Sequence, residues 1–129
     1  MAPAEVSIVG KRFLVLDDEF LIALDIQQTL EAAGAASVMA AGNAEDALAL
    51  LRNEPRFDLA VLDVLLCGAM RTCLPVAAVL AVQKTPFVFL TGMQGEDVHT
   101  KKFPLAPVVE KPYRSPLLMD AILRALAAR

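Results

Sequence analysis

Short apolar runs alternate along the chain with longer segments in which apolar residues recur every three or four positions. Several of the runs are uninterrupted and end abruptly at an acidic or polar residue, as strands buried on both faces of a sheet do. The remaining runs are weaker but follow in the same alternation. Together they predict five strands, at residues 13–16, 37–41, 59–62, 87–90 and 108–109.

The segments between these runs predict helices. Residues 20–30 have helical spacing, and Gly34 provides a left-handed stop. Asn43, with Asp46 three positions later, is typical of a helix N-cap, and this second helix must end before Pro55. The first two strands are therefore each followed by a helix.

The second half of the chain repeats this alternation. Pro75 suits the first turn of a helix over residues 76–83, and residues 115–116 open a last helix that runs to the carboxyl end. Residues 92–107 lack a convincing amphipathic period, so we expect the fourth helix to be short, irregular or mobile. The alternation predicts an α/β domain: an open parallel sheet with helices on both faces.

Composition narrows the class of protein. The 129 residues suffice for one domain, and the longest apolar stretch, residues 74–82, is well short of a membrane span of roughly 20 residues. A formal net charge of −3 offers no basic surface for nucleic acid. The amino terminus has no cationic segment ahead of an apolar one. We therefore expect a cytoplasmic protein with neither membrane nor nucleic acid as a partner.

Two cysteines, Cys67 and Cys73, are too few for a disulfide framework, and with one histidine they cannot complete a zinc site. We expect both to be reduced. Cys67 is interpreted as a small packed thiol rather than a redox group. A redox thiol needs neighbours that lower its pKa, and Arg71 is the one basic residue near it in the sequence. The role of the long loop over residues 67–74 stays open.

Polar residues gather where the predicted strands end. They are Asp17, Asp18, Asp63, Thr91 and Lys111. Parallel strands bring their carboxyl ends to one edge of the sheet, so all five are expected to face one crevice. Three close carboxylates repel unless a cation compensates, and hard oxygen ligands suit an ion such as Mg²⁺. A lysine and a hydroxyl donor beside them favour an anion of phosphoryl type over Asp63.

Each of these residues has an ordinary explanation when it is taken singly. Acidic residues after the first strand favour the amino end of a helix, and an aspartate after a strand often starts a turn. Their joint order at four strand ends is what favours a shared site.

The same strand ends carry motifs that resemble the receiver domains of response regulators in two-component signalling. The matching segments are residues 13–19, 57–64, 86–92 and 109–113. The resemblance predicts an N-terminal extension over residues 1–10 and a receiver domain over residues 11–129. Residues 89–92, with Gly95 and residues 111–113, resemble the alphaproteobacterial FAT GUY subclass, whose members are often stand-alone receivers.

The resemblance implies a doubly wound, five-stranded parallel sheet of flavodoxin-like order 2-1-3-4-5. It implies phosphoryl transfer to Asp63 from a histidine kinase or a histidine phosphotransfer protein. It also implies Mg²⁺ held by Asp18, Asp63 and the backbone carbonyl of Leu65, with Asp17 acting through a water. Lys111 would then pair with a phosphoryl oxygen.

Two further residues would respond to phosphorylation in such a domain. The resemblance implies that Thr91 swings toward the phosphoryl group. Receivers of the common type also carry an aromatic residue three positions before the lysine, where this chain has Val108. Tyr113 is a candidate to replace that aromatic as part of the switch; its other interpretation is a half-buried anchor for the last helix.

The predicted function is therefore a single-domain response regulator without an output domain, in a chain expected to be complete. Signalling would occur by contact of residues 92–106 and the last helix with an unknown downstream protein or a second copy, giving a homodimer. The domain would catalyse its own phosphorylation without being a turnover enzyme. Leu65 and Met93 are apolar where polar residues could orient water, so self-hydrolysis is expected to be slow.

Other functions fit less well. An aspartyl-phosphate hydrolase needs a second carboxylate two residues after the nucleophile, where this chain has Leu65. Nucleotide or flavin binding would need a glycine-rich loop after Leu16, which the sequence lacks. A pseudo-receiver that binds partners without phosphorylation stays open because of Val108.

Overall fold

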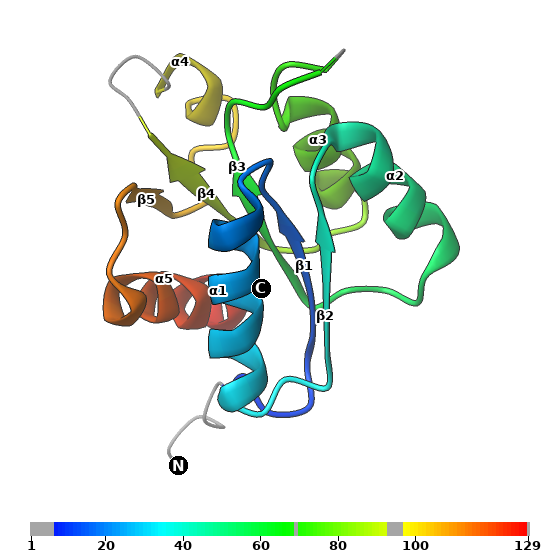
Figure 1. The fold of residues 1–129 in the computed structure, drawn as a ribbon. Coiled ribbons are helices and arrows are strands. Elements are labelled where there is room, and N and C mark those ends of the chain that lie inside the picture. The colour runs from blue at the N-terminus through cyan, green and yellow to red at the C-terminus, as the bar shows by residue number, and fades with distance from the viewer. Residues whose placement is uncertain (1–6, 69, 93–96, 129) are drawn as a thin grey trace.

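The computed structural model describes residues 7–68, 70–92 and 97–128, and its centre is a five-stranded sheet (Figure 1). The strands are β1 (Arg12–Leu16), β2 (Ser37–Ala41), β3 (Leu59–Asp63), β4 (Phe87–Thr91) and β5 (Val108–Glu110). Every neighbouring pair is parallel, in the order β2-β1-β3-β4-β5. The structure thus confirms the predicted doubly wound sheet of flavodoxin-like order.

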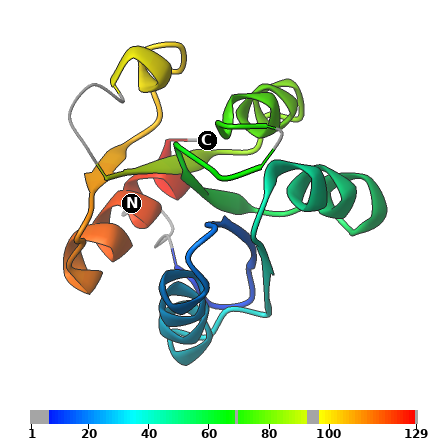
Figure 2. The same cartoon turned by 45° about the horizontal axis from the view of Figure 1, so that its top comes forward.

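Helices cover both faces of this sheet (Figures 1 and 2). They are α1 (Phe20–Ala32), α2 (Ala44–Asn53), α3 (Leu74–Val82), α4 (Asp97–Thr100) and α5 (Ser115–Ala127). Helices α1 and α5 pack on one face, and α2 and α3 pack on the other. The predicted cap of α2 is present, because the Asn43 side chain accepts a hydrogen bond from the Asp46 N–H.

The structure can be compared with the sequence-based expectations for α3 and α4. Helix α3 begins at Leu74, before the predicted start, and Pro75 lies in its first turn as expected. Helix α4 is a single turn, which confirms the expectation of a short fourth helix. The predictions that involve Met93 and Gly95 lie outside the described residues.

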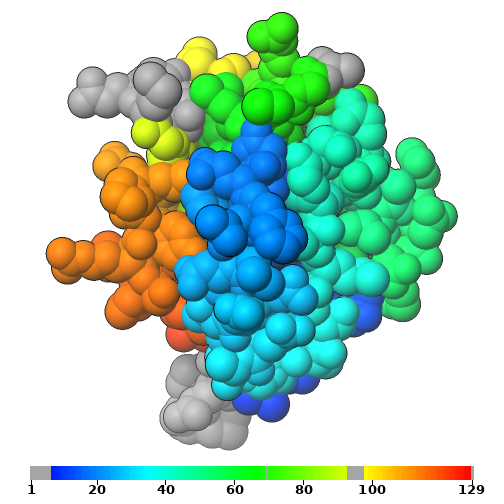
Figure 3. Space-filling model, viewed as in Figure 1, coloured from blue at the N-terminus to red at the C-terminus, as the bar shows by residue number. Residues whose placement is uncertain are grey.

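Strands β1, β3 and β4 are buried on both sides, because successive side chains point to opposite faces and helices cover each face. Phe13 and Val15 of β1 join the apolar cluster under α1 and α5. Leu14 and Leu16 join the cluster under α2 and α3. Ile8, from the segment predicted to be an extension, is buried in the first cluster. In the space-filling view, α1 lies along the middle of its face, beside the segment leading into α5 (Figure 3).

This architecture brings the carboxyl ends of β1, β3 and β4 to one edge of the sheet, which we call the carboxyl edge. The loops that begin there follow Leu16, Asp63 and Thr91. None of the helices among the described residues is both long enough and apolar enough to cross a membrane.

Candidate functional site

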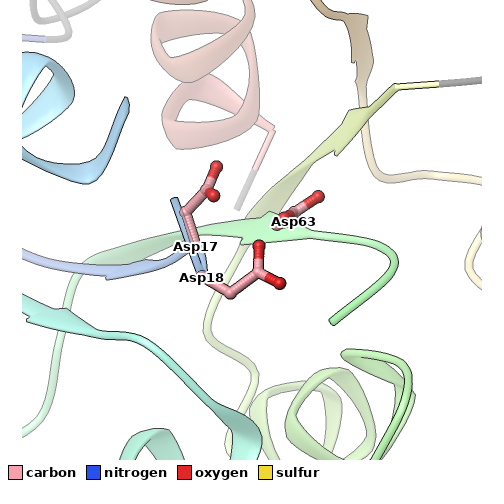
Figure 4. Close-up of side chains that lie close together, drawn as sticks. All are labelled: Asp17, Asp18 and Asp63. Atoms are coloured by element: carbon pink, nitrogen blue, oxygen red, sulfur yellow. The ribbon is translucent and has the colours of Figure 1, made fainter. Parts of the chain in front are cut away.

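Three carboxylates meet at the carboxyl edge. Asp17 and Asp18 follow β1 directly, and Asp63 is the last residue of β3, the strand that pairs with β1 (Figure 4). One carboxylate oxygen from each lies within 4.8 Å of the other two. Asp17 and Asp63 are buried, whereas Asp18 is partly open to solvent. The pairing of β1 with β3 therefore holds three acidic side chains close together, although their negative charges repel one another.

Backbone contacts fix the two residues after β1. Asp17 continues the sheet by donating its N–H to the Ala41 carbonyl, at 3.1 Å, while its Oδ1 accepts the Glu19 N–H at 2.8 Å. Asp18 Oδ2 accepts the N–H of Cys67 at 3.0 Å, from the loop after β3. The loop after β3 thus anchors the more exposed carboxylate.

Lys111 contacts two of these carboxylates, those of Asp17 and Asp63, and also that of Glu19. Its Nζ lies 3.0 Å from Asp17 Oδ2, 3.3 Å from Asp63 Oδ2 and 3.5 Å from Glu19 Oε1. Its backbone N–H donates to the carbonyl of Thr91 at 2.7 Å. Thr91 is buried at the end of β4, so the residues at four strand ends form one connected group.

The electrostatics of the group are set by burial and by its excess of acid. Burial disfavours the charged form of Asp63, and Asp17 repels it; with Lys111 only partly offsetting these effects, the pKa of Asp63 rises to about 8. Burial lowers the pKa of Lys111, but its contacts with Asp17 and Asp63 outweigh this and raise that pKa overall. Near neutral pH the cluster therefore needs either a proton on Asp63 or another positive charge.

Asp18 differs from Asp63 because it is less buried and accepts hydrogen bonds from Cys67. Burial alone would raise its pKa, but the hydrogen bonds from Cys67 outweigh burial, and the pKa of Asp18 lies below its usual range. Asp18 therefore stays ionised while Asp63 holds its proton.

The donor set fits Mg²⁺. Carboxylate oxygens are the hard ligands that this ion takes, and Asp18 leaves one side open for the waters that it keeps. The raised pKa of Asp63 is a second indication, since a divalent cation would remove the repulsion that causes part of it. Asp18 and Asp63 are the carboxylates that would hold the ion, and Asp17, whose oxygens face the Glu19 N–H and Lys111, would act through a water.

Two parts of the loop after Asp63 pair with each other. Leu65 pairs with Thr72 in an isolated antiparallel bridge, and the Leu66 N–H donates to the Arg71 carbonyl at 2.7 Å. This pairing joins residues 65–66 to residues 71–72. Leu65, the predicted carbonyl ligand, lies in this loop two residues from Asp63 and is 42% exposed.

Tyr113 connects the loop after β5 to α1. Its hydroxyl donates to Asp25 Oδ2, and its ring packs against the cluster under α1 and α5. Burial and the Asp25 carboxylate raise the pKa of Tyr113. Val108, at the position of the usual receiver aromatic, is 47% exposed. Tyr113 therefore ties the loop after β5 to α1, a contact that does not test its predicted part in the switch.

The interpretation of Cys67 as a packed thiol is wrong. Cys67 is exposed, and Cys73 is the buried cysteine. A hydrogen bond from the Cys67 thiol to Asp18, together with the charge of that carboxylate, raises the pKa of Cys67. A thiol of raised pKa is a poor nucleophile at neutral pH, so redox control gains no support.

Three contacts of the site were not predicted from the sequence. They are the ion pair of Glu19 with Lys111, the hydrogen bond of Cys67 to Asp18, and that of Tyr113 to Asp25. The Asp17-Asp18-Glu19 run could have indicated the first. The other two join residues 49 and 88 positions apart, and no sequence pattern pairs them.

Comparisons with known proteins bear on this geometry. No protein-family model matches the chain, and no curated protein matches it significantly. Solved structures do match. A response regulator receiver protein from Sinorhizobium medicae is 27% identical with a TM-score of 0.82, over 95% of this chain and 98% of that one.

Two further structures extend this result. A CheY-like response regulator receiver domain protein from Methanospirillum hungatei is 24% identical, with a TM-score of 0.80, over 92% of this chain and 95% of that one; at this identity it shows the fold alone. The response regulator PhyR from Brucella abortus is 27% identical, with a TM-score of 0.73, over 92% of this chain and 49% of that one. The chain therefore has the flavodoxin-like fold of CheY-like receivers, and its structural neighbours are response regulator receiver domains.

Proposed function

We propose that residues 11–129 form a receiver domain of a response regulator that accepts a phosphoryl group on Asp63. The observation that carries the proposal is the cluster of Asp17, Asp18 and Asp63, with the Lys111 ammonium in contact with two of the three carboxylates. In-line phosphoryl transfer requires positioning and charge neutralisation more than acid–base catalysis, and this cluster supplies both.

In the proposed reaction, an oxygen of the ionised Asp63 carboxylate attacks the phosphorus of a phosphohistidine on a kinase or phosphotransfer protein. The P–O bond forms as the P–N bond breaks, and the departing imidazole keeps the bonding electron pair and takes a proton from solvent. Asp18 and Asp63, with the Leu65 carbonyl and Asp17 through a water, would hold Mg²⁺, which neutralises charge on the transferred group. Lys111 would pair with one of its oxygens.

The response to phosphorylation is proposed to pass through Lys111 and Thr91. Lys111 is shared among three carboxylates, so a phosphoryl group on Asp63 would draw its Nζ away from Asp17 and Glu19. The hydrogen bond from Lys111 N–H to the Thr91 carbonyl couples this movement to the end of β4. Thr91 would turn toward the phosphoryl group, and Tyr113 would limit how far the loop after β5 moves.

The output is proposed to be contact with a downstream protein or a second copy through residues 92–106 and α5, in a stand-alone cytoplasmic receiver of the FAT GUY type. Within this segment, residues 93–96 lie outside the described residues. The alternative is an interaction module that needs no phosphorylation. The exposed Val108, in place of an aromatic, favours that alternative. The acidic, threonine and lysine positions of the site favour phosphorylation.

The test is incubation with Mg²⁺ and phosphoramidate, followed by intact-mass measurement. The wild type should gain one phosphoryl group, Asp63→Asn should gain none, and removal of Mg²⁺ by a chelator should prevent labelling. Asp120→Asn is the matched control, because Asp120 is exposed and paired with Arg124 on α5. Absence of labelling in the wild type, or equal labelling of Asp63→Asn, would contradict the proposal.

A further inference from the structure

A hollow of about 590 Å³ lies at the opposite edge of the sheet from the acidic cluster. Its walls come from the ends of α3 and α5, from Phe87 at the start of β4 and from residues 102–107. We call it the amino-edge hollow. Its volume falls within the range of about 300 to 1,000 Å³ that is typical of small-molecule sites.

The lining of the amino-edge hollow is mainly apolar. Phe103 packs edge-on against Phe87, with ring centroids 5.4 Å apart, and gives the hollow an aromatic wall. Leu105, on the same segment, is 96% exposed. Covering this leucine and the aromatic wall beside it would remove apolar surface from water, which is favourable in free energy.

The charge of the lining is entirely positive in the described residues. Lys84 and Lys102 line the hollow, and no acidic residue does so there. Across residues 7–68, 70–92 and 97–128, neither lysine side chain has an ion pair or a hydrogen bond. In a chain with a net charge of −3, this is a local reversal of sign.

The backbone at Lys84 adds an independent observation. Lys84 lies just after Gln83, the C-cap of α3, with a φ of 59°, in the left-handed region where glycine is the usual residue. Its N–H donates to the Ala81 carbonyl, which closes the helix in the usual way. A lysine at a position that favours glycine places a cationic side chain at the wall of the hollow.

We propose that the amino-edge hollow binds a small amphiphilic anion, a carboxylate on an alkyl or aryl body. The body would cover Phe103 and Leu105, and the carboxylate would pair with Lys84 and Lys102. This ligand chemistry satisfies both properties of the hollow, since a neutral apolar molecule leaves the lysines unpaired and a bare anion leaves the apolar wall exposed. The inference does not depend on phosphorylation of Asp63.

The test is a titration of the ¹⁵N-labelled protein with octanoate and, separately, with 1-octanol, followed by amide chemical shifts. Octanoate should bind saturably, with a dissociation constant on the order of 1 mM, and should shift amides of Phe87, Phe103 and Ala125. The alcohol has the same chain without the charge, so it should bind more weakly. Shifts confined to the amides around Asp63 would contradict the proposal.

Variants separate charge from apolar contact. Lys84→Ala and Lys102→Ala should each weaken octanoate binding about two- to fivefold, the range of a partly exposed ion pair, and leave 1-octanol unaffected. Lys101→Ala, which removes the same charge from a residue outside the lining, is the matched control. Equal affinity for the two probes, an equal effect of Lys101→Ala, or no saturable binding would each overturn the proposal. Because the wild type needs no phosphoryl donor here, these outcomes are independent of the test of Asp63.

Discussion

The two edges of the sheet differ in the burial and the charge of the side chains that they carry. At the carboxyl edge, the acidic residues Asp17, directly after β1, and Asp63, at the end of β3, are buried, and Lys111 contacts both of them. At the amino edge, the segment before β5 leaves Leu105 open to solvent beside the side chains of Lys84 and Lys102. A buried charged group couples strongly to its neighbours because little water screens it, whereas exposed groups act almost independently. Substitutions at the first edge should therefore have large, pH-dependent effects, and those at the second edge small ones.

The largest expected effect is that of Lys111→Ala. The ammonium lies between two buried carboxylates and faces the proposed phosphoryl group, so its loss should slow phosphorylation by phosphoramidate about 100-fold, as for removal of one preorganised electrostatic contact. Lys102→Ala removes the same charge from the amino edge and should leave the rate unchanged. The measurement is the initial rate of phosphoprotein formation at saturating Mg²⁺. Similar rates for the two variants would remove the contrast between the edges.

The second effect concerns stability of the metal-free protein and its dependence on pH. The pKa of Asp63 is about 8 in the folded state and 3.8 in a model peptide. Between these values the folded state holds a proton that the unfolded state has released, so the free energy of unfolding falls as the pH rises from 4 to 8. Asp63→Asn has no such proton. Its free energy of unfolding should match that of the wild type near pH 4 and exceed it by on the order of 2 kcal/mol at pH 8. This difference is smaller than the whole pKa shift would give, because solvent on the side of Asp18 screens the charges.

Urea denaturation across this pH range measures the difference. Mg²⁺ should restore stability to the wild type at pH 8 and have little effect on Asp63→Asn, because the ion would replace the lost proton as a source of positive charge. Asp120→Asn, on the exposed side of α5, should keep the pH profile of the wild type. Parallel profiles for the wild type and Asp63→Asn would show that Asp63 is not the group that carries the repulsion.

Much of the carboxyl edge could be predicted from the sequence, for a physical reason. The strands are uninterrupted apolar runs, and each polar residue that ends a run has its place fixed by the sheet. Parallel pairing then brings Asp17, Asp63 and Lys111 together without any knowledge of the loops.

The contacts made by loops and helix surfaces could not be predicted in this way. Tyr113 and Asp25 are 88 positions apart, and Asp25 is an ordinary exposed residue in the pattern of α1. The exposure of Cys67 depends on the pairing of residues 65–66 with residues 71–72, for which the sequence has no strand signal. The amino-edge hollow likewise depends on how a one-turn helix and the loop after it settle against α3 and α5.

The third prediction tests whether the carboxyl edge is held from outside the acidic cluster. Tyr113 lies two residues after Lys111 and is tied to α1 by Asp25, so the pair fixes the loop that carries the lysine. In a double-mutant cycle of Tyr113→Phe and Asp25→Ala, the coupling in the free energy of unfolding should be about 1 kcal/mol, as for a partly exposed hydrogen bond to a charged group. Tyr113→Phe alone should also slow phosphorylation about threefold through looser placement of Lys111. Additive effects on stability would show that the two side chains do not interact in solution.

The smallest expected effect belongs to the amino edge. Leu105 is 96% exposed, so Leu105→Ser should change the free energy of unfolding by less than about 0.5 kcal/mol, whereas Leu14→Ala in the core should cost about 2 to 5 kcal/mol. A loss of more than about 1 kcal/mol for Leu105→Ser would mean that this leucine is covered in solution. Sedimentation would then separate two causes: a second copy seated on the hollow makes the loss depend on protein concentration, and a loop closed over it does not. In either case the amino edge would already be buried, and the contrast between an open apolar edge and a closed charged edge would no longer hold.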